Sequence, residues 1–152
     1  MKKVLFATAV AASLLAGCAS VPMESPEKDA EAKKFNPPSE GNSGLYIYRA
    51  SGPGTALKKS IWVNDKCVGE SAQNVYFYEE VIGGKEHKVS TESEFSPNDL
   101  LVKTEPNQNY FINQYIKMGV FVGGANLKLV DEASGKEKVS KLKMAVKGNC
   151  GK

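Results

Sequence analysis

Cys18 is the residue whose surroundings say most about chemistry in this sequence. It follows two N-terminal lysines and an almost wholly apolar stretch, residues 4–16. The small residues Ala16 and Gly17 stand directly before it, and a signal peptidase pocket admits residues of this size. A cysteine thiol can carry a diacylglyceryl group as a thioether. The pattern therefore predicts cleavage before Cys18 and attachment of a lipid to its sulfur.

The apolar stretch is too short to remain in a membrane as a helix. It has about a dozen residues, whereas spanning a bilayer takes roughly 18 to 20. We therefore interpret residues 1–17 as a signal peptide, and Leu15 to Cys18 resemble a bacterial lipobox. By resemblance to bacterial sorting rules, Ala19 in place of an aspartate implies the inner leaflet of the outer membrane, with the protein facing the periplasm. The alternative is an ordinary secretory signal in which Cys18 is incidental.

Two further cysteines, Cys67 and Cys150, remain once Cys18 carries the lipid. The compartment outside the cytoplasm oxidises thiols. The tail around Cys150 consists of Lys, Gly and Asn and should fray unless it is tied down. We therefore predict a disulfide that closes a loop of roughly 80 residues, worth about 4 to 5 kcal/mol at most in the chain-entropy model. The alternative is two separate thiols, one in a strand and one on a loose tail.

Aromatic side chains alternate with aliphatic ones in three segments of the chain. Successive residues of a strand point to opposite faces of a sheet, so Leu45 and Ile47 share one face and the tyrosines the other. Such a face could bind a glycan or another protein of the cell envelope. The alternative is that a second layer or the N-terminal segment covers the tyrosines. The candidate partner-binding residues are Tyr46, Tyr48, Trp62, Tyr76 and Tyr78.

No grouping of residues predicts catalysis, and we expect no metal and no cofactor. His87 is the single histidine, so a Ser-His-Asp triad would have to be built around it, and its position after a turn favours a structural role. The spacings of cysteine and histidine that bind zinc do not occur. The glycines of residues 119–126 lack the Lys-Ser/Thr of a phosphate loop and fit a hairpin turn better. Glu79 and Glu80 fit solvated charges at a strand end.

Removal of the signal peptide changes the charge of the chain. It takes away two lysines and leaves 18 basic and 17 acidic residues among 135. A net charge near zero removes the main electrostatic argument for nucleic acid binding, and we expect none. A chain of this length can form one domain with a real core but not two ordinary ones.

The pattern beyond residue 43 is typical of a mainly β protein. Short alternating segments, separated by turn signals at even spacing, favour an antiparallel β-sandwich. We assign residues 44–150 to this domain. It should contain about seven to eight short strands, which we place at residues 44–49, 60–63, 75–81, 87–91, 100–104, 110–116, 120–122 and 127–130.

The segment between the lipid and the sandwich, residues 18–43, reads as a linker. It is rich in proline and poor in apolar residues, so it can bury little surface. One short helix is expected from Pro26 to about Lys34, with Ser25 as its N-cap and Phe35 as its contact with the domain. Near the other end of the chain, residues 137–147 fit either a strand or a helix face. We favour a helix there.

The chain resembles the small proteobacterial lipoproteins that carry a single domain of unknown function and are related in shape to PEGA-like β-sandwiches. The resemblance implies an extracytoplasmic β-sandwich on a lipid anchor and implies no activity. It covers nearly all of the chain after the lipobox. The stretches that carry it are "AKKFNPPSEGNSGLYIYR", "IWVNDKCVGE", "IGGKEHKV", "NYFINQYIKMG" and "VDEASGK".

Two classes of function follow from these features. The first is a lipid-anchored, non-catalytic protein of the cell envelope that acts as a periplasm-facing binding or scaffolding module. Its partners would be the membrane, through the anchor, and an envelope protein or glycan. The second is a small periplasmic hydrolase that acts on the cell wall or another envelope substrate. The single histidine and the lack of a nucleophile motif favour the first class, so we expect no enzymatic activity.

Overall fold

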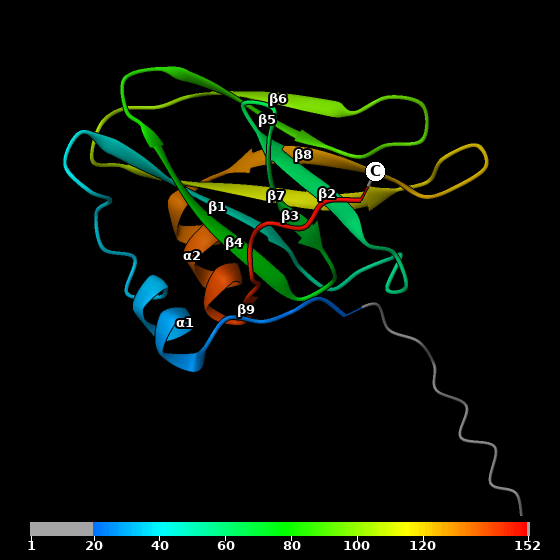
Figure 1. The fold of residues 1–152 in the computed structure, drawn as a ribbon, viewed down its shortest axis with the longest axis horizontal. Coiled ribbons are helices and arrows are strands. Elements are labelled where there is room, and N and C mark those ends of the chain that lie inside the picture. The colour runs from blue at the N-terminus through cyan, green and yellow to red at the C-terminus, as the bar shows by residue number, and fades with distance from the viewer. Residues whose placement is uncertain (1–19, 152) are drawn as a thin grey trace, which may run out of the picture.

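The protein folds into three layers (Figure 1). The computed structural model describes residues 20–151, in which the chain forms nine strands and two helices. Two β-sheets pack face to face around one core, and the helices cover the outer face of the larger sheet. The predicted mainly β sandwich with a short N-terminal helix is confirmed. Cys18 and the predicted signal peptide lie outside the described residues.

The larger sheet has five strands and the smaller has four. Neighbouring strands run antiparallel except for two parallel pairs, β1 with β7 and β4 with β9, which the antiparallel prediction did not include. In spatial order the five-stranded sheet contains β8 (Gly124–Val130), β7 (Asn109–Lys117), β1 (Asn42–Arg49), β4 (Val75–Ile82) and β9 (Lys143–Met144). The four-stranded sheet contains β3 (Lys66–Ser71), β2 (Lys59–Val63), β5 (Glu86–Thr91) and β6 (Asn98–Lys103).

Strand alternation places the aliphatic residues between the two sheets. Leu45 and Ile47 of β1 are fully buried there, and Phe77 of β4 reaches them from the neighbouring strand. The four-stranded sheet contributes Ile61, among others, from its inner face. The hairpin of β2 and β3 turns at Asn64 and Asp65, which both have positive φ, as the favoured two-residue hairpin turns require.

The opposite face of the five-stranded sheet carries the tyrosines, and the helices cover it. Tyr46, Tyr48 and Tyr76 are buried against α1 (Pro26–Ala32), α2 (Glu132–Ser140) and the residues that flank them. The prediction that this face is an accessible aromatic surface is therefore wrong for these three tyrosines. The alternative, that another layer covers them, describes the structure.

Helix α2 begins earlier than the sequence suggested. Asp131 caps it by accepting a hydrogen bond from the Ser134 backbone N–H, so residues 132–136, which precede the stretch where we expected a helix, form its first part. Gly135 faces Phe111 so closely that a Cβ at this position would overlap the ring. The ambiguous stretch 137–147 divides, because its first part completes α2 and Lys143–Met144 forms β9.

The segment expected to be a linker is largely part of the folded domain. Val21 packs against the core between the sheets, and Met23 forms a β-bridge with Ala145. Helix α1 has the predicted Ser25 cap, and Phe35 lies against the tyrosine layer. The linker prediction relied on the average composition of the segment, which is poor in apolar residues. The few apolar residues that it does contain make the contacts with the domain. Within residues 20–151 no helix is long and apolar enough to cross a membrane.

Cys67 of β3 and Cys150 near the C-terminus form the predicted disulfide. Their Cα atoms lie 6.0 Å apart, and they are separated by 83 positions in the sequence. Backbone contacts continue this attachment on both sides of Cys150. The N–H of Gly148 donates to the carbonyl of Val68, and that of Gly151 donates to the hydroxyl of Ser60. The C-terminal residues 148–151 therefore run along the four-stranded sheet.

Candidate functional site: an apolar loop end

Exposed apolar side chains gather at one end of the sandwich, where two loops meet. Of all large apolar side chains in residues 20–151, the four most exposed lie here: Met118 (92%), Phe121 (83%), Phe95 (77%) and Val120 (75%). Val122, 56% exposed, belongs to the same loop. Phe95 lies between β5 and β6, and the other four lie between β7 and β8. We call these five residues the loop end.

The carboxylate of Glu94 holds the β7–β8 loop in place. It accepts hydrogen bonds from the backbone N–H groups of Val120 (2.6 Å), Phe121 (2.5 Å) and Val122 (3.3 Å). Partial desolvation raises the pKa of Glu94, but these three donors lower it by more, so the carboxyl group titrates below its ordinary value of 4.5. The predicted strand at residues 120–122 is wrong, because these N–H groups pair with a side chain and not with a neighbouring strand.

Because of the hydrogen bonds to Glu94, the loop exposes its side chains to solvent while three of its backbone N–H groups are paired. Unpaired N–H groups are costly to remove from water, and here three successive ones already have an acceptor. Gly119 makes the tight path possible, because a Cβ at this position would overlap the carbonyl of Val122 and approach the Glu94 carboxylate. The apolar side chains are thus presented on a backbone in which three successive N–H groups already have an acceptor.

The loop between β1 and β2 packs against the loop between β7 and β8 through Leu57. Leu57 lies close to Gly123, where a Cβ would collide with its side chain. Arg49, buried at the end of β1, donates hydrogen bonds to the carbonyls of Leu57 (2.7 Å) and Gly54 (2.5 Å). Burial lowers the pKa of the Arg49 guanidinium. The two carbonyls compensate the positive charge of the buried Arg49, and these hydrogen bonds hold the loop between β1 and β2 in place.

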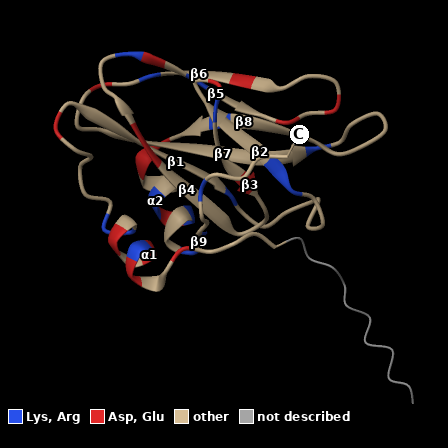
Figure 2. Ribbon diagram, viewed as in Figure 1, with Lys and Arg blue, Asp and Glu red and all other residues tan. Residues whose placement is uncertain are grey.

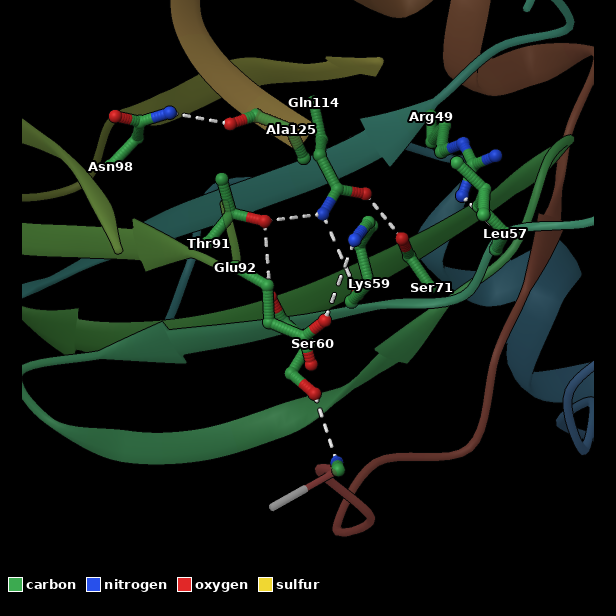
Figure 3. A network of polar contacts seen from close by, with 11 residues as sticks. Arg49, Leu57, Lys59, Ser60, Ser71, Thr91, Glu92, Asn98, Gln114 and Ala125 are labelled. Carbon is green, nitrogen blue, oxygen red and sulfur yellow. Dashed lines mark hydrogen bonds and ion pairs between the residues drawn. The ribbon is translucent and has the colours of Figure 1, made fainter. Parts of the chain in front are cut away.

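A network of buried polar side chains joins the two sheets just beneath these loops (Figure 3). Gln114 of β7 accepts a hydrogen bond from the hydroxyl of Ser71 on β3 and donates to that of Thr91 on β5 (2.7 Å). Thr91 in turn donates to the carbonyl of Ser60 (3.0 Å). Polar groups buried in this way stabilise a single arrangement only when they are paired. The network therefore gives the loop end a rigid base.

The five aromatic candidates from the sequence do not form one surface. Tyr46 lies at the centre of the buried layer, with ring centroids 4.7 Å from Tyr78 and 5.0 Å from Phe111. Its hydroxyl donates to the carbonyl of Ala32 in α1 (2.8 Å), and burial, with Glu80 nearby, raises its pKa to about 12. Trp62 lies on the other sheet, half-buried beside a hollow of about 470 Å³.

Part of the tyrosine layer still borders a surface hollow. Tyr46 and the half-buried Tyr78 line a space of about 280 Å³ beside α1, together with Met144 and residues of the helix. The hydroxyl of Tyr76 donates to the Asp29 carboxylate (2.8 Å) and faces no solvent. These contacts attach α1 to the sheet, so we assign the tyrosines a structural role.

His87 is also held by structural contacts. Its Nδ1 accepts a hydrogen bond from the Asn64 side-chain amide (2.8 Å), and its Nε2 donates to the carbonyl of Ile82 (2.7 Å). The side chain is buried next to a hollow of about 300 Å³ that Glu79 and Glu80 also line. In the part of the chain that the structure describes, no three His, Cys, Asp or Glu side chains are grouped so that they could hold a metal ion.

The sequence contains a signal for the loop end. The glycines of this stretch predicted a hairpin turn, but we also placed a strand at residues 120–122, and exposure of the apolar side chains was not predicted. Val120 to Val122 are apolar, lie between Gly119 and Gly123 and carry no charge. Valine and phenylalanine favour strands, so the run resembled one. Its short length and flanking glycines are equally typical of an exposed hairpin loop.

Comparisons with known proteins agree with one another. A family model described as "Protein of unknown function (DUF2846)" matches residues 39–125, which include both loops of the loop end. A protein of Haemophilus influenzae, described as uncharacterized, is 59% identical over 135 residues, covering 89% of this chain and 80% of the relative. No solved structure matches the chain significantly. The chain therefore belongs to the DUF2846 family of proteins of unknown function.

Proposed function

We propose that this protein is a lipid-anchored, non-catalytic protein of the cell envelope whose domain is a binding or scaffolding module. The anchor is Cys18, acylated after removal of residues 1–17, and the domain faces the periplasm from the inner leaflet of the outer membrane. The lipobox resemblance and Ala19 support this location. The disulfide between Cys67 and Cys150 supports a compartment that oxidises thiols.

The loop end is the observation that carries the proposed binding role. Apolar side chains that remain exposed on a folded domain mark a surface for a partner or a membrane when they are contiguous. Here Glu94 holds the backbone of Val120 to Val122, and the Gln114 network lies beneath the loop, so the backbone that carries these side chains has a fixed position. A surface of this kind lowers the entropic cost of binding because little has to be ordered on contact.

The hydrolase alternative gains no support from the surroundings of His87. A general base has to reach the proton it removes, and both ring nitrogens of this histidine are engaged by Asn64 and the Ile82 carbonyl. Release of soluble fragments from purified peptidoglycan by the full-length protein would contradict the proposed non-catalytic role. We expect no release above that of a heat-denatured sample.

The anchor is tested with Cys18→Ser in a bacterial host that processes lipoproteins. We expect this variant to incorporate no labelled palmitate, to retain its signal peptide or become soluble, and to leave the outer-membrane fraction. The unchanged protein should be acylated and sediment with outer membranes. Acylation of the variant would contradict the role of Cys18, and recovery of the unchanged protein in inner membranes would contradict the proposed location.

A further inference from the structure

The folded domain begins almost directly after the proposed lipid attachment site. The carbonyl of Pro22 accepts a hydrogen bond from the N–H of Val146 (2.9 Å), and the N–H of Glu24 donates to the carbonyl of Met144 (2.9 Å). Val21, just before, already packs against the core. Three residue steps separate Cys18 from Val21, and three extended residues reach only about 10 Å. An acylated Cys18 would therefore hold the domain against the lipid surface.

The described chain starts on the same side of the molecule as the loop end. In Figure 1, the first described residues and the loops between β5 and β6 and between β7 and β8 all lie at the right. Strand register agrees, because β9, which pairs with the N-terminal segment, lies beside the first residues of β4. Val75, the first of these, pairs with Arg49 at the end of β1, from which the loop between β1 and β2 begins.

The chemistry of the loop end fits the surface of a bilayer. Residues 118–126 carry no charge, and the loop between β7 and β8 is tan in Figure 2, the colour of residues other than Lys, Arg, Asp and Glu. Exposed Lys117 directly precedes the apolar residues, and exposed Lys58 belongs to the loop between β1 and β2. Apolar side chains with lysines at their border are typical of segments that enter the headgroup region, where the lysines approach lipid phosphates.

The hydrogen bonds to Glu94 reduce the cost of moving the β7–β8 loop from water into the lipid. A backbone that enters an apolar medium must have its N–H groups satisfied within the protein. The N–H groups of Val120, Phe121 and Val122 already donate to the Glu94 carboxylate, whose charge these donors partly offset. These three N–H groups therefore need no new hydrogen-bond partner when the side chains come among the lipids.

We propose that the loop end inserts its side chains into the headgroup and upper acyl region of the same bilayer that holds the Cys18 lipid. The domain then lies on the membrane in one fixed orientation, with the loop end toward the lipid and the end that carries Ile82 away from it. This inference rests on the proposed acylation of Cys18. It names a phospholipid surface, not a protein, as the partner of the loop end.

The experiment measures the depth of a tryptophan in full-length, acylated protein. The natural Trp62 is replaced by Phe, and a new tryptophan is introduced by Phe121→Trp or, as a matched control, Ile82→Trp. Both positions hold exposed apolar residues, 83% and 59% respectively, at opposite ends of the sandwich. The protein is placed in vesicles of phosphatidylethanolamine and phosphatidylglycerol whose acyl chains carry bromine. We expect the bromine to quench the tryptophan at 121 several-fold more than the tryptophan at 82.

Equal quenching at the two positions, or none at 121, would overturn the proposed insertion. Intact mass of the same samples shows whether Cys18 is acylated, so a failed insertion with an acylated Cys18 leaves the proposed anchor standing. A chain without acyl groups would overturn both. Photocross-linking from position 121 in intact cells gives a second test. Capture of one stoichiometric protein would overturn the lipid assignment and favour a protein partner, whereas cross-links to phospholipid would support it.

Discussion

At the scale of single residues, one carboxylate couples the two sheets. Glu94 belongs to the loop between two strands of the four-stranded sheet, and its three donors belong to a hairpin of the five-stranded sheet. The pairing is therefore a polar connection between the two sheets at their surface, in addition to the buried network around Gln114. Since the group lies at the surface, its loss should release the hairpin tip without unfolding the core.

Acidification should release this hairpin tip, because protonation of Glu94 weakens its hydrogen bonds to the loop. The pKa of Glu94 lies below its ordinary value of 4.5 in the folded protein. A group with a lowered pKa stabilises the folded form above its ordinary value and loses this effect as the pH falls through the lowered one. We therefore expect amide protection factors at Val120 and Phe121 to be constant from neutral pH down to about 4.5 and to fall below it.

Hydrogen exchange followed by NMR measures this effect, with Glu94→Gln as the control. The variant removes the titrating group, so its protection factors should be lower at neutral pH and should not change over the same range. Protection that depends on pH equally in both proteins would assign the effect to another group. Amides of β1 serve as an internal reference because they should stay protected.

At the scale of elements, the tyrosines join the helices to the sheet. Three of them lie on adjacent strands, Tyr46 and Tyr48 on β1 and Tyr76 on β4. The hydroxyls of Tyr46 and Tyr76 donate to Ala32 and Asp29 of α1. The Asp29 carboxylate extends this contact to the Met144 N–H of β9 (3.0 Å). The layer therefore acts as a second core, and its disruption should affect the stability of the whole domain.

Substitution of the central ring should cost much of the folding free energy. Tyr46→Ala removes a buried ring that contacts Phe35, Tyr78 and Phe111, and we expect a loss of about 3 to 5 kcal/mol by analogy with other large-to-small core substitutions. Chemical denaturation measures the change. Tyr115→Ala, at a partly exposed ring, is the control and should cost less than about 1 kcal/mol. A Tyr46→Ala variant as stable as the control would show that the layer is not a core.

Most strand positions could be predicted from the sequence because alternation is local, although β3 was not among the strands we placed and residues 120–122 form a loop. The segments around Leu45, Ile61 and Phe77 carry their aliphatic residues at every second position, and these residues form the core as expected. Alternation separates two faces but does not say what covers each of them. The tyrosines therefore looked available for binding, although distant groups such as Ala32 and Asp29 lie over them.

The candidate site could not be predicted because its determinant is distant in sequence. Val120 to Val122 have the composition of a strand, and the residue that holds them as a loop is Glu94, 26 to 28 positions earlier. Helix α2 was placed too late for a related reason. Its early turn contains Gly135, a poor helix former that the packing against Phe111 requires. The disulfide, by contrast, could be predicted, because assignment of Cys18 to the lipid leaves Cys67 and Cys150 as one possible pair.

At the scale of the whole molecule, the disulfide fixes the C-terminal residues to the four-stranded sheet. Replacement of Cys67 and Cys150 by serine should reduce the free energy of unfolding by about 2 to 5 kcal/mol, because the unfolded chain loses a long closed loop. Denaturation with and without reductant measures it. The double variant should be insensitive to reductant, and equal stability of the oxidised and reduced natural protein would contradict the expectation.

The pairing of Met23 with Ala145 has a consequence for the order in which the chain can fold. A polypeptide emerges from synthesis or export with its N-terminus first, yet the strand partner of its earliest described residues is among the last to arrive. Contacts of such long separation close late. A chain that stops before residue 143 leaves the outer edge of β4 and the underside of α1 without their partners. Residues 143–145 therefore complete the domain, and a copy truncated before them should be more readily cleaved by proteases.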